Sequence, residues 1–273
     1  MELQPKWGRR GMAVAPHSLA AESAVSVLRE GGNALEAMIA AAATIAVVYP
    51  HMNSIGGGSV WVIHRPGHAM GGIDACGASA ALASRQWYAD QGLTQAIPFR
   101  GSVAANTVAG TLSGWGAAHR LSSLSLGGRL PMKRLLDDAI AYARHGVPVT
   151  HSQHRLTAAK LAELKDQPGF ASTFLSGGQS PQTGSVFLQP KLATTLEQIA
   201  RAGTDDFYRG DLARSIAHDL ERLGSPLRLA DLQRHQAKLV DPLTLAHSQG
   251  RVRSEEHTSE LQSRLHLVCR LLL

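Results

Sequence analysis

A run of apolar residues near the start of the chain, residues 37–48, contains one polar side chain, Thr44. A helix that is apolar on every side must be buried on every side. The run is shorter than the roughly 20 residues that cross a bilayer, so no membrane span is predicted. Asn33 and Glu36 have the spacing of a helix N-cap and its reciprocating acid. Tyr49-Pro50 ends the pattern, because proline clashes with the preceding turn. The chain is therefore predicted to be organised around a buried helix that begins directly after Asn33.

The segments before this helix predict a strand and a half-exposed helix. Residues 11–15 form a short apolar stretch with strand character, and Pro16-His17 follows it as a turn. Ser18 is a residue type that favours the N-cap of a helix over residues 19–30. Gly31-Gly32 is expected to end that helix. Its apolar residues fall mostly on one face, so the other face should meet solvent.

The segments after the buried helix predict a β-hairpin. Gly56-Gly57-Gly58 lets the backbone turn sharply or approach a neighbour closely. Residues 59–64 and residues 68–76 have strand composition and flank a turn signal, Arg65-Pro66-Gly67. A strand, two helices and a hairpin in this order predict an α+β fold.

The remaining chain is predicted to be mainly helical between residues 102 and 240. Pro131 and Gly146 stand at the start and the end of one amphipathic segment, as such residues do in helices. Residues 106–121 are expected to begin loosely and to become helical near Ser113. The other helices are expected over residues 84–91, 131–145, 150–166, 189–201, 211–223 and 229–235.

The composition excludes several classes of protein. The chain has 273 residues, of which 44% are hydrophobic, enough for a substantial core. Its formal charge is +6, but the 27 Lys and Arg residues are scattered, so no nucleic-acid partner is predicted. The chain has only two cysteines, Cys76 and Cys269, and so low a cysteine content is typical of proteins in a reducing compartment. No apolar signal segment follows the basic residues 1–10, which favours a cytoplasmic location.

The last segment, residues 253–273, does not resemble the rest of the chain. Its first part, RSEEHTSELQS, is the peptide that a common sequencing-library adapter encodes when it is translated. We therefore expect residues 1–252 to be the native part and residues 253–273 to be an assembly artefact. The alternative is a genuine amphipathic helix for a partner, with an apolar stripe at Leu261, Leu265, Val268 and Leu272.

Residues 11–58, GMAVAPHSLAAESAVSVLREGGNALEAMIAAAATIAVVYPHMNSIGGG, resemble the start of the large subunit in proenzymes of the gamma-glutamyltransferase family. The shared features are the GGNA segment, the buried helix and a P-H-M-x-x-I-G-G-G turn at fixed offsets. ANTVAG at residues 105–110 and DDFYRGDLA at residues 205–213 resemble that family as well. The resemblance covers about residues 11–245.

This resemblance implies both a fold and a mechanism. Family members are N-terminal nucleophile hydrolases with an αββα sandwich, so the chain is expected to contain part of that sandwich and a mainly helical second half. Their precursor cuts itself ahead of a threonine, whose hydroxyl attacks an amide carbonyl while its α-amine serves as the base. The threonine and the glycines that hold the oxyanion lie in the small subunit, downstream of the matched region. We therefore expect no catalytic residue in this chain, and we expect the small subunit as its missing partner.

No other residues are expected to replace this machinery. Thr194-Thr195 is the only pair of adjacent threonines, but it lies within a helical pattern. Ser54 and Ser59 flank the glycines without a His-Asp arrangement and are interpreted as turn residues. The lone histidines His17 and His51 are interpreted as structural. No metal or cofactor is predicted, because metal-ligand spacing is missing and GGGS lacks the lysine of a phosphate loop.

One departure from the family lies just after Asp74. Members that act on gamma-glutamyl substrates usually have an Arg-Glu pair there, and the arginine grips the substrate's α-carboxylate. Cys76 and Gly77 stand in place of that pair. IDACG and AANTVAG resemble instead the branch related to oxamate amidohydrolase, which acts on a small amide beside a carboxylate. Asp74, Cys76 and Gly77 are thus the candidate substrate contacts, although for Cys76 the sequence favours the role of a small buried filler over that of a pocket residue.

The predicted function is that of a truncated proenzyme. Its intact parent would hydrolyse a small amide or transfer the acyl group from it, and the fragment alone would be inactive. The alternative is a non-catalytic helical binding module built on the same scaffold, which requires residues 253–273 to be native.

Overall fold

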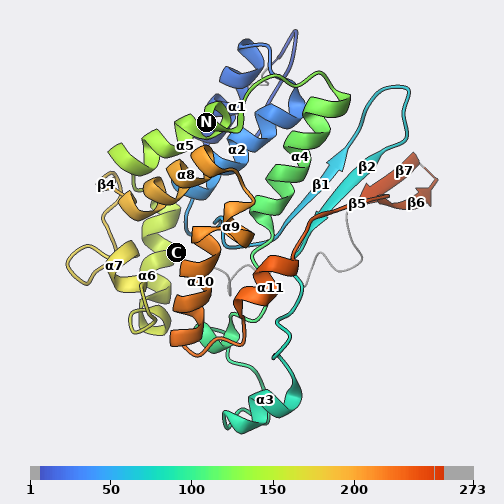
Figure 1. Ribbon diagram of the computed structural model, residues 1–273. Coiled ribbons are helices and arrows are strands. Elements are labelled where there is room, and N and C mark those ends of the chain that lie inside the picture. Colours follow the sequence, from blue (N-terminus) through green and yellow to red (C-terminus); the bar gives the residue numbers. More distant parts are fainter. Residues whose placement is uncertain (1–6, 249, 255–273) are drawn as a thin grey trace.

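The computed structural model describes residues 7–248 and 250–254. A body of packed helices lies beside a small antiparallel sheet (Figure 1), which confirms the predicted α+β class. None of the helices in these residues is long and apolar enough to cross a bilayer. The helices are α1 (Ser18–Arg29), α2 (Ala34–Val48), α3 (Arg85–Asp90), α4 (Thr111–Ser125), α5 (Met132–His145), α6 (His151–Leu164), α7 (Phe170–Phe174), α8 (Pro190–Ala202), α9 (Asp206–Arg209), α10 (Asp211–Arg222) and α11 (Leu229–Arg234). The strands are β1 (Ser59–Ile63), β2 (Gly71–Ala75), β3 (Val147–Pro148), β4 (Val186–Phe187), β5 (Lys238–Val240), β6 (Leu243–His247) and β7 (Gly250–Ser254).

The buried helix predicted from the apolar run is α2, and its start is as expected. Asn33 Oδ1 accepts hydrogen bonds from the backbone N–H groups of Leu35 at 3.0 Å and Glu36 at 3.1 Å. The Glu36 carboxylate in turn accepts from the Asn33 N–H at 2.8 Å. This reciprocal pair satisfies N–H groups that a helix start otherwise leaves unbonded. The capping box predicted from the sequence is therefore confirmed.

Glu36 also joins α2 to a distant segment. Its side chain is 1% exposed, and Oε1 accepts hydrogen bonds from the backbone N–H groups of Arg129 at 2.7 Å and Leu130 at 2.8 Å. A buried carboxylate is tolerated only when its oxygens are hydrogen-bonded. Three backbone donors supply those bonds here, so the start of α2 and the entry to α5 are held together.

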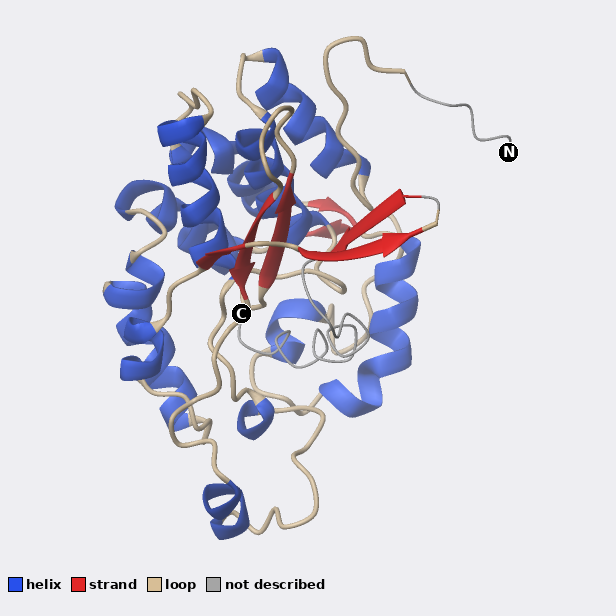
Figure 2. Cartoon of the chain, turned by 90° about the vertical axis from the view of Figure 1, so that its right-hand side faces the viewer, coloured by secondary structure: helices blue, strands red, loops and turns tan. Residues whose placement is uncertain are grey.

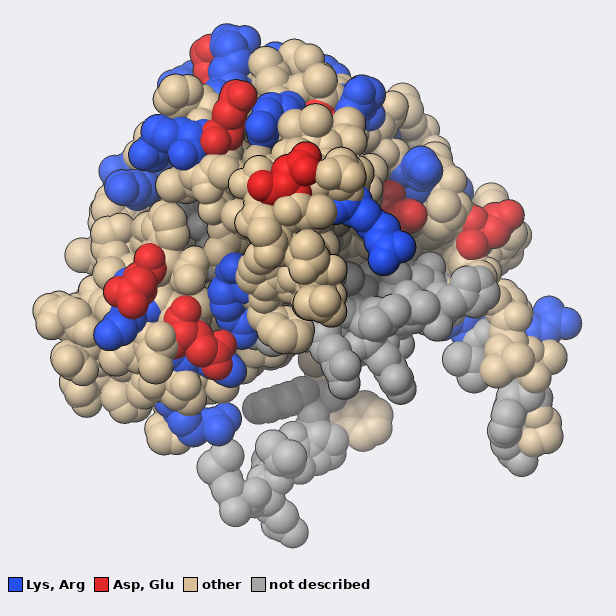
Figure 3. Space-filling model, turned by 90° about the horizontal axis from the view of Figure 1, so that it is seen from below, with Lys and Arg blue, Asp and Glu red and all other residues tan. Residues whose placement is uncertain are grey.

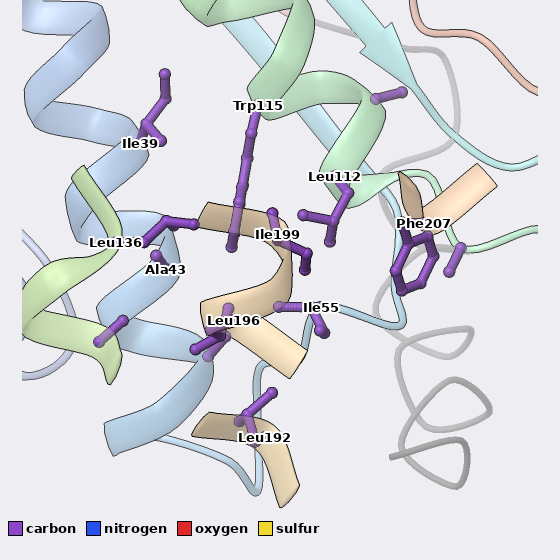
Figure 4. Close-up of a cluster of buried hydrophobic side chains, with 14 of the residues drawn as sticks. Ile39, Ala43, Ile55, Leu112, Trp115, Leu136, Leu192, Leu196, Ile199 and Phe207 are labelled. Carbon is purple, nitrogen blue, oxygen red and sulfur yellow. The ribbon is translucent and has the colours of Figure 1, made fainter. Parts of the chain in front are cut away.

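The core lies where α2 meets α4, α5 and α8 (Figure 4). Ile39 of α2 and Trp115 of α4 point into it, and both are at most 1% exposed. Leu136 of α5 and Leu196 of α8 are fully buried in the same cluster. A helix that carries buried residues around most of its circumference can pack against several neighbours at once. This arrangement explains why α2 lacks a polar face.

The sheet has the strand order β1-β2-β5, with both pairs antiparallel. The hairpin of β1 and β2 confirms the prediction from the glycine and proline signals, with Ser59 opposite Ala75 and Ile63 opposite Gly71. Its third strand, β5, was not predicted, because it comes from a segment more than 160 residues farther along the chain and is only three residues long. Figure 2 shows the strands near the centre of the view, with helices on either side. Asp74 of β2 lies opposite Lys238 of β5 in this register.

Two predictions near the N-terminus were wrong. Residues 11–15 form no strand, since no other segment of the described chain pairs with them. The N-cap of α1 is His17 rather than Ser18: Nδ1 of His17 accepts a hydrogen bond from the Leu19 N–H at 3.2 Å, and Ser18 is the first helical residue. An imidazole nitrogen can thus fill the acceptor role that a serine hydroxyl usually fills.

The second half of the chain confirms the predicted helices and adds short elements that no periodicity indicated. These are α7, α9, the β3–β4 pair and the β6–β7 hairpin. The last strand, β7, includes residues 253 and 254, the first two residues of the segment predicted to be an artefact. The rest of that segment, with Cys269 and the stripe from Leu261 to Leu272, lies outside the described residues.

Candidate functional site

The three residues predicted to contact substrate lie together at the carboxyl end of β2. The backbone N–H of Cys76 donates to Oδ1 of Asp74 at 2.8 Å, and this bond holds the turn after the strand. Cys76 is exposed, so the favoured prediction that it is a small buried filler was wrong. We call the hollow beside these residues the β2 pocket. It measures about 340 Å³ and is lined by Asp74, Cys76, Gly77, Ala78, Ser79, Val108, Asp231, Arg234, His235, Gln236 and Lys238.

Gly77 packs directly against the backbone of Val108. A Cβ atom added at Gly77 would lie 1.6 Å from the carbonyl oxygen of Val108, far inside van der Waals contact. The neighbouring Val108 N–H donates to the carbonyl of Ala78 at 3.0 Å. The segment after β2 and the segment before α4 therefore lie side by side. In this backbone no side chain fits at position 77.

The glycine turn, residues 56–58, packs against the same end of β2. The N–H and the hydroxyl of Thr111 donate to the carbonyl of Gly57, at 2.9 and 2.8 Å. A Cβ atom at Gly58 would lie 3.4 Å from both the Ala75 oxygen and the Cys76 Cα. The turn therefore serves as scaffold: it binds the first residue of α4 and packs against the strand that carries Asp74.

The opposite wall of the β2 pocket comes from α11 and β5, which the sequence analysis did not connect with Asp74. Lys238 is exposed and stands across from Asp74 in the sheet. Arg234 pairs with Asp231 at 2.6 Å. His235 is 7% exposed, and its Nε2 is buried with no hydrogen-bond partner in the described part of the chain. No local pattern marked these residues, since only the folded sheet brings them to β2.

The ring of His235 is held between an aromatic side chain and an arginine. It lies 5.2 Å from the ring of Tyr208, and a guanidinium N–H of Arg209 donates to the His235 carbonyl at 3.1 Å. Burial lowers the pKa of His235, and the positive charges of Arg209 and Lys238 lower it further, while Asp74 acts in the opposite direction. The imidazole is therefore neutral at neutral pH.

Tyr208 fixes the position of the segment that precedes α4. Its hydroxyl donates to the Ala109 carbonyl at 2.8 Å and accepts from the Ser113 N–H at 2.9 Å. Burial raises the pKa of Tyr208, so the phenol stays protonated and can donate its hydrogen bond to the Ala109 carbonyl. The Ser113 hydroxyl accepts from the Ala237 N–H at 2.7 Å, which ties α4 to the start of β5. These bonds connect the two walls of the pocket.

The other hydroxyl candidates have structural bonds. Thr194 and Thr195 lie within α8, and their hydroxyls donate to the carbonyls of Pro190 and Lys191, both at 3.1 Å. Ser54 accepts from the Gly56 N–H at 3.1 Å, as a turn residue does. Ser59 lies in β1, not in the turn, and accepts from the Trp61 indole N–H at 3.3 Å. None of these hydroxyls lines the β2 pocket.

The two histidines interpreted as structural, His17 and His51, do not line the β2 pocket. His17 caps α1, and Nε2 of His51 lies 3.0 Å from the Ser152 hydroxyl. Among the described residues, no group of three or more His, Cys, Asp or Glu side chains is placed to hold a metal ion. Figure 3 shows basic and acidic side chains interspersed on the described part of the face that it displays.

Comparison with known sequences identifies related proteins. A family model described as Gamma-glutamyltranspeptidase matches residues 20–264, which extends past residue 252. An oxamate amidohydrolase proenzyme of Klebsiella pneumoniae is 55% identical over 240 residues, 88% of this chain and 45% of that relative. A glutathione hydrolase proenzyme of Pseudomonas aeruginosa is 31% identical over 235 residues, 85% of this chain and 40% of that relative. The chain thus spans less than half the length of these curated relatives.

Solved structures show the same likeness in three dimensions. Gamma-glutamyltranspeptidase of Helicobacter pylori aligns with a TM-score of 0.85 and 28% identity, covering 94% of this chain and 73% of that one. Gamma-glutamyltranspeptidase from Pseudomonas nitroreducens aligns with a TM-score of 0.81 and 30% identity, covering 93% and 73%. The predicted fold, part of an N-terminal nucleophile hydrolase, is confirmed by these neighbours. With its family model, its relatives and its fold in agreement, the chain belongs to the gamma-glutamyltranspeptidase family.

Proposed function

We propose that this chain is the N-terminal part of an amidohydrolase that acts on a small amide beside a carboxylate. The observation that carries the proposal is the end of β2, where Cys76 and Gly77 stand in place of the Arg-Glu pair of gamma-glutamyl enzymes. The close packing of Gly77 on Val108 leaves no room for a side chain there. The relative that is 55% identical is named oxamate amidohydrolase proenzyme. In oxamate the amide carbon is bonded directly to a carboxylate, so the substrate is small and charged at one end.

The nucleophile of this reaction comes from the part of the protein that corresponds to the unmatched length of the relatives. A threonine hydroxyl is a weak nucleophile until a neighbouring base takes its proton, and an N-terminal α-amine can be that base. The acyl group then passes from the amide nitrogen to the threonine oxygen, and water releases it as a carboxylate. Backbone N–H groups stabilise the oxyanion that forms on the way. The hydroxyls of Ser54, Ser59 and Thr111, near the glycine turn, each take part in a structural hydrogen bond, which supports the expectation that residues 1–273 alone are inactive.

A second candidate is a non-catalytic binding module on the same scaffold. The observation in its favour is β7, which continues through residues 253 and 254 and pairs them with Leu243 and Thr244 of β6. A native segment would pair in this way. Two paired residues are only a short extension of the strand, however. The chain spans 45% of the relative that is 55% identical, and this partial coverage is the stronger argument for a truncated amidohydrolase.

Reading the genomic DNA across codon 252 distinguishes the two candidates. We expect the reading frame to depart from the printed sequence at that point and to continue into a segment that encodes a threonine preceded by a cleavage site. A reading frame that encodes residues 253–273 as printed and then stops would contradict the amidohydrolase and support the binding module.

A further inference from the structure

Two cations, Arg234 and Lys238, line the β2 pocket, and a third, Arg209, contacts its lining residue His235; Arg234 and Arg209 are already paired. Arg234 pairs with Asp231 at 2.6 Å. Arg209 pairs with Asp205 and also donates to the carbonyl of His235. Lys238 makes no ion pair with any described residue. Its ammonium group is therefore the cation lining this pocket that remains available to a ligand.

The backbone places Lys238 beside the residues predicted to contact substrate. Lys238 and Asp74 are directly opposite each other in the antiparallel pair of β5 and β2, so their side chains lie on the same face of the sheet. Both line the β2 pocket together with Cys76 and Gly77. Two strands, and not one loop, thus hold Lys238 in the wall of the pocket. A position on a strand is more precise than a position on a mobile loop.

A buried polar group without a partner lines the same pocket. His235 is 7% exposed, and its Nε2 has no hydrogen-bond partner among the described residues. A buried polar atom left without a hydrogen bond costs roughly 1–3 kcal/mol, so such atoms mark places where a ligand or water completes the structure. A neutral imidazole offers one donor and one acceptor. The pocket thus combines an unpaired cation with a hydrogen-bonding ring.

From this combination we propose that the β2 pocket is a carboxylate subsite, in which Lys238 binds the carboxylate of the small amide substrate and His235 contributes a hydrogen bond. This inference rests on the proposed function for the identity of the substrate. Lys238 is the specificity-determining residue, since it distinguishes an amide that carries a carboxylate from a neutral amide of the same size. His235 orients the carboxylate. The pocket of about 340 Å³ has room for a small amide beside the carboxylate.

Steady-state kinetics of the full-length gene product test this subsite, with oxamate and its neutral analogue pyruvamide as substrates. Lys238→Met is expected to raise KM for oxamate about 10- to 100-fold, the usual effect of losing a charge-assisted hydrogen bond. It should change kcat less than about 3-fold, because the lysine binds substrate and does not take part in bond cleavage. KM for pyruvamide should stay unchanged. Lys238→Arg should restore most of the oxamate affinity by restoring the charge.

Two further variants complete the test. Lys133→Met removes an exposed lysine from α5, which does not line the pocket, and should leave both KM values unchanged. His235→Phe keeps a ring against Tyr208 and should raise KM for oxamate alone. An unchanged KM for oxamate in folded Lys238→Met protein, or an equal rise for pyruvamide, would overturn the subsite.

Calorimetric titration with oxamate separates this inference from the proposed function. If the wild-type full-length protein binds oxamate, if Lys238→Met abolishes the heat, and if no ammonia is released, the subsite stands while the proposed amidohydrolase fails. If the protein hydrolyses oxamate and Lys238→Met binds it as tightly as wild type, the proposed amidohydrolase stands and the subsite fails.

Discussion

Gly77→Ala is expected to destabilise the folded protein by about 3 kcal/mol or more, a value at or above the upper end of ordinary overpacking. The reason is geometric: the added methyl carbon would lie 1.6 Å from the Val108 oxygen and 2.6 Å from its carbonyl carbon. Both are backbone atoms, so no side-chain rotation can relieve the clash. Urea denaturation followed by circular dichroism measures the change. Because Gly77 lines the β2 pocket, any folded variant should also lose ligand binding.

The matched control is Gly71→Ala, at the other end of the same strand. A Cβ atom at Gly71 meets no atom within 4 Å, and its backbone conformation is one that alanine adopts readily. We expect a change of less than about 0.5 kcal/mol, as for surface substitutions away from special features. Equal stability of the two variants would show that the contact between the β2 turn and Val108 is not as close as described.

Glu36→Ala is the second substitution with a large expected effect. It removes the acceptor for three backbone N–H groups, those of Asn33, Arg129 and Leu130, at 2.7–2.8 Å. Each buried donor left without a partner costs roughly 1–3 kcal/mol, so a total of about 3–5 kcal/mol is expected after partial relaxation. Thermal and urea unfolding measure the loss.

Two controls separate this effect from simple loss of a charge. Glu36→Gln keeps one carbonyl oxygen and should recover part of the stability. Glu197→Ala breaks a surface ion pair with Arg144 and should cost less than about 1 kcal/mol, because the carboxylate is 41% exposed. Stability of Glu36→Ala within 1 kcal/mol of wild type would contradict the role assigned to the buried carboxylate.

The features predicted correctly from the sequence depend on signals that are close together in the chain. The capping box of α2 needs only Asn33 and Glu36, three residues apart, and the β1–β2 hairpin needs only the turn between its strands. The same holds for α5, which begins after Pro131 and ends before Gly146. In each case the residue type limits the backbone conformation locally, so the pattern could be recognised without knowing the fold.

The features that were missed depend on contacts between distant segments. Lys238 reaches Asp74 through a three-residue strand, too short for a periodic pattern. The acceptor role of Glu36 toward residues 129 and 130 likewise has no signal in either segment. Residues 11–15 show the opposite case, since strand composition without a partner strand gave no strand. Asp74, Cys76 and Gly77 were proposed as site residues through family resemblance, whereas the other wall of the pocket that they line could be seen only in the structure.

Ammonia release from oxamate tests most directly the claim that this chain is the scaffold half of an N-terminal-threonine amidohydrolase. Purified residues 1–273 and the full-length gene product are assayed side by side at equal concentration. The account predicts ammonia release by the full-length product that a threonine-directed inhibitor abolishes, and none by residues 1–273. Turnover of oxamate by residues 1–273 that is insensitive to the inhibitor would contradict it.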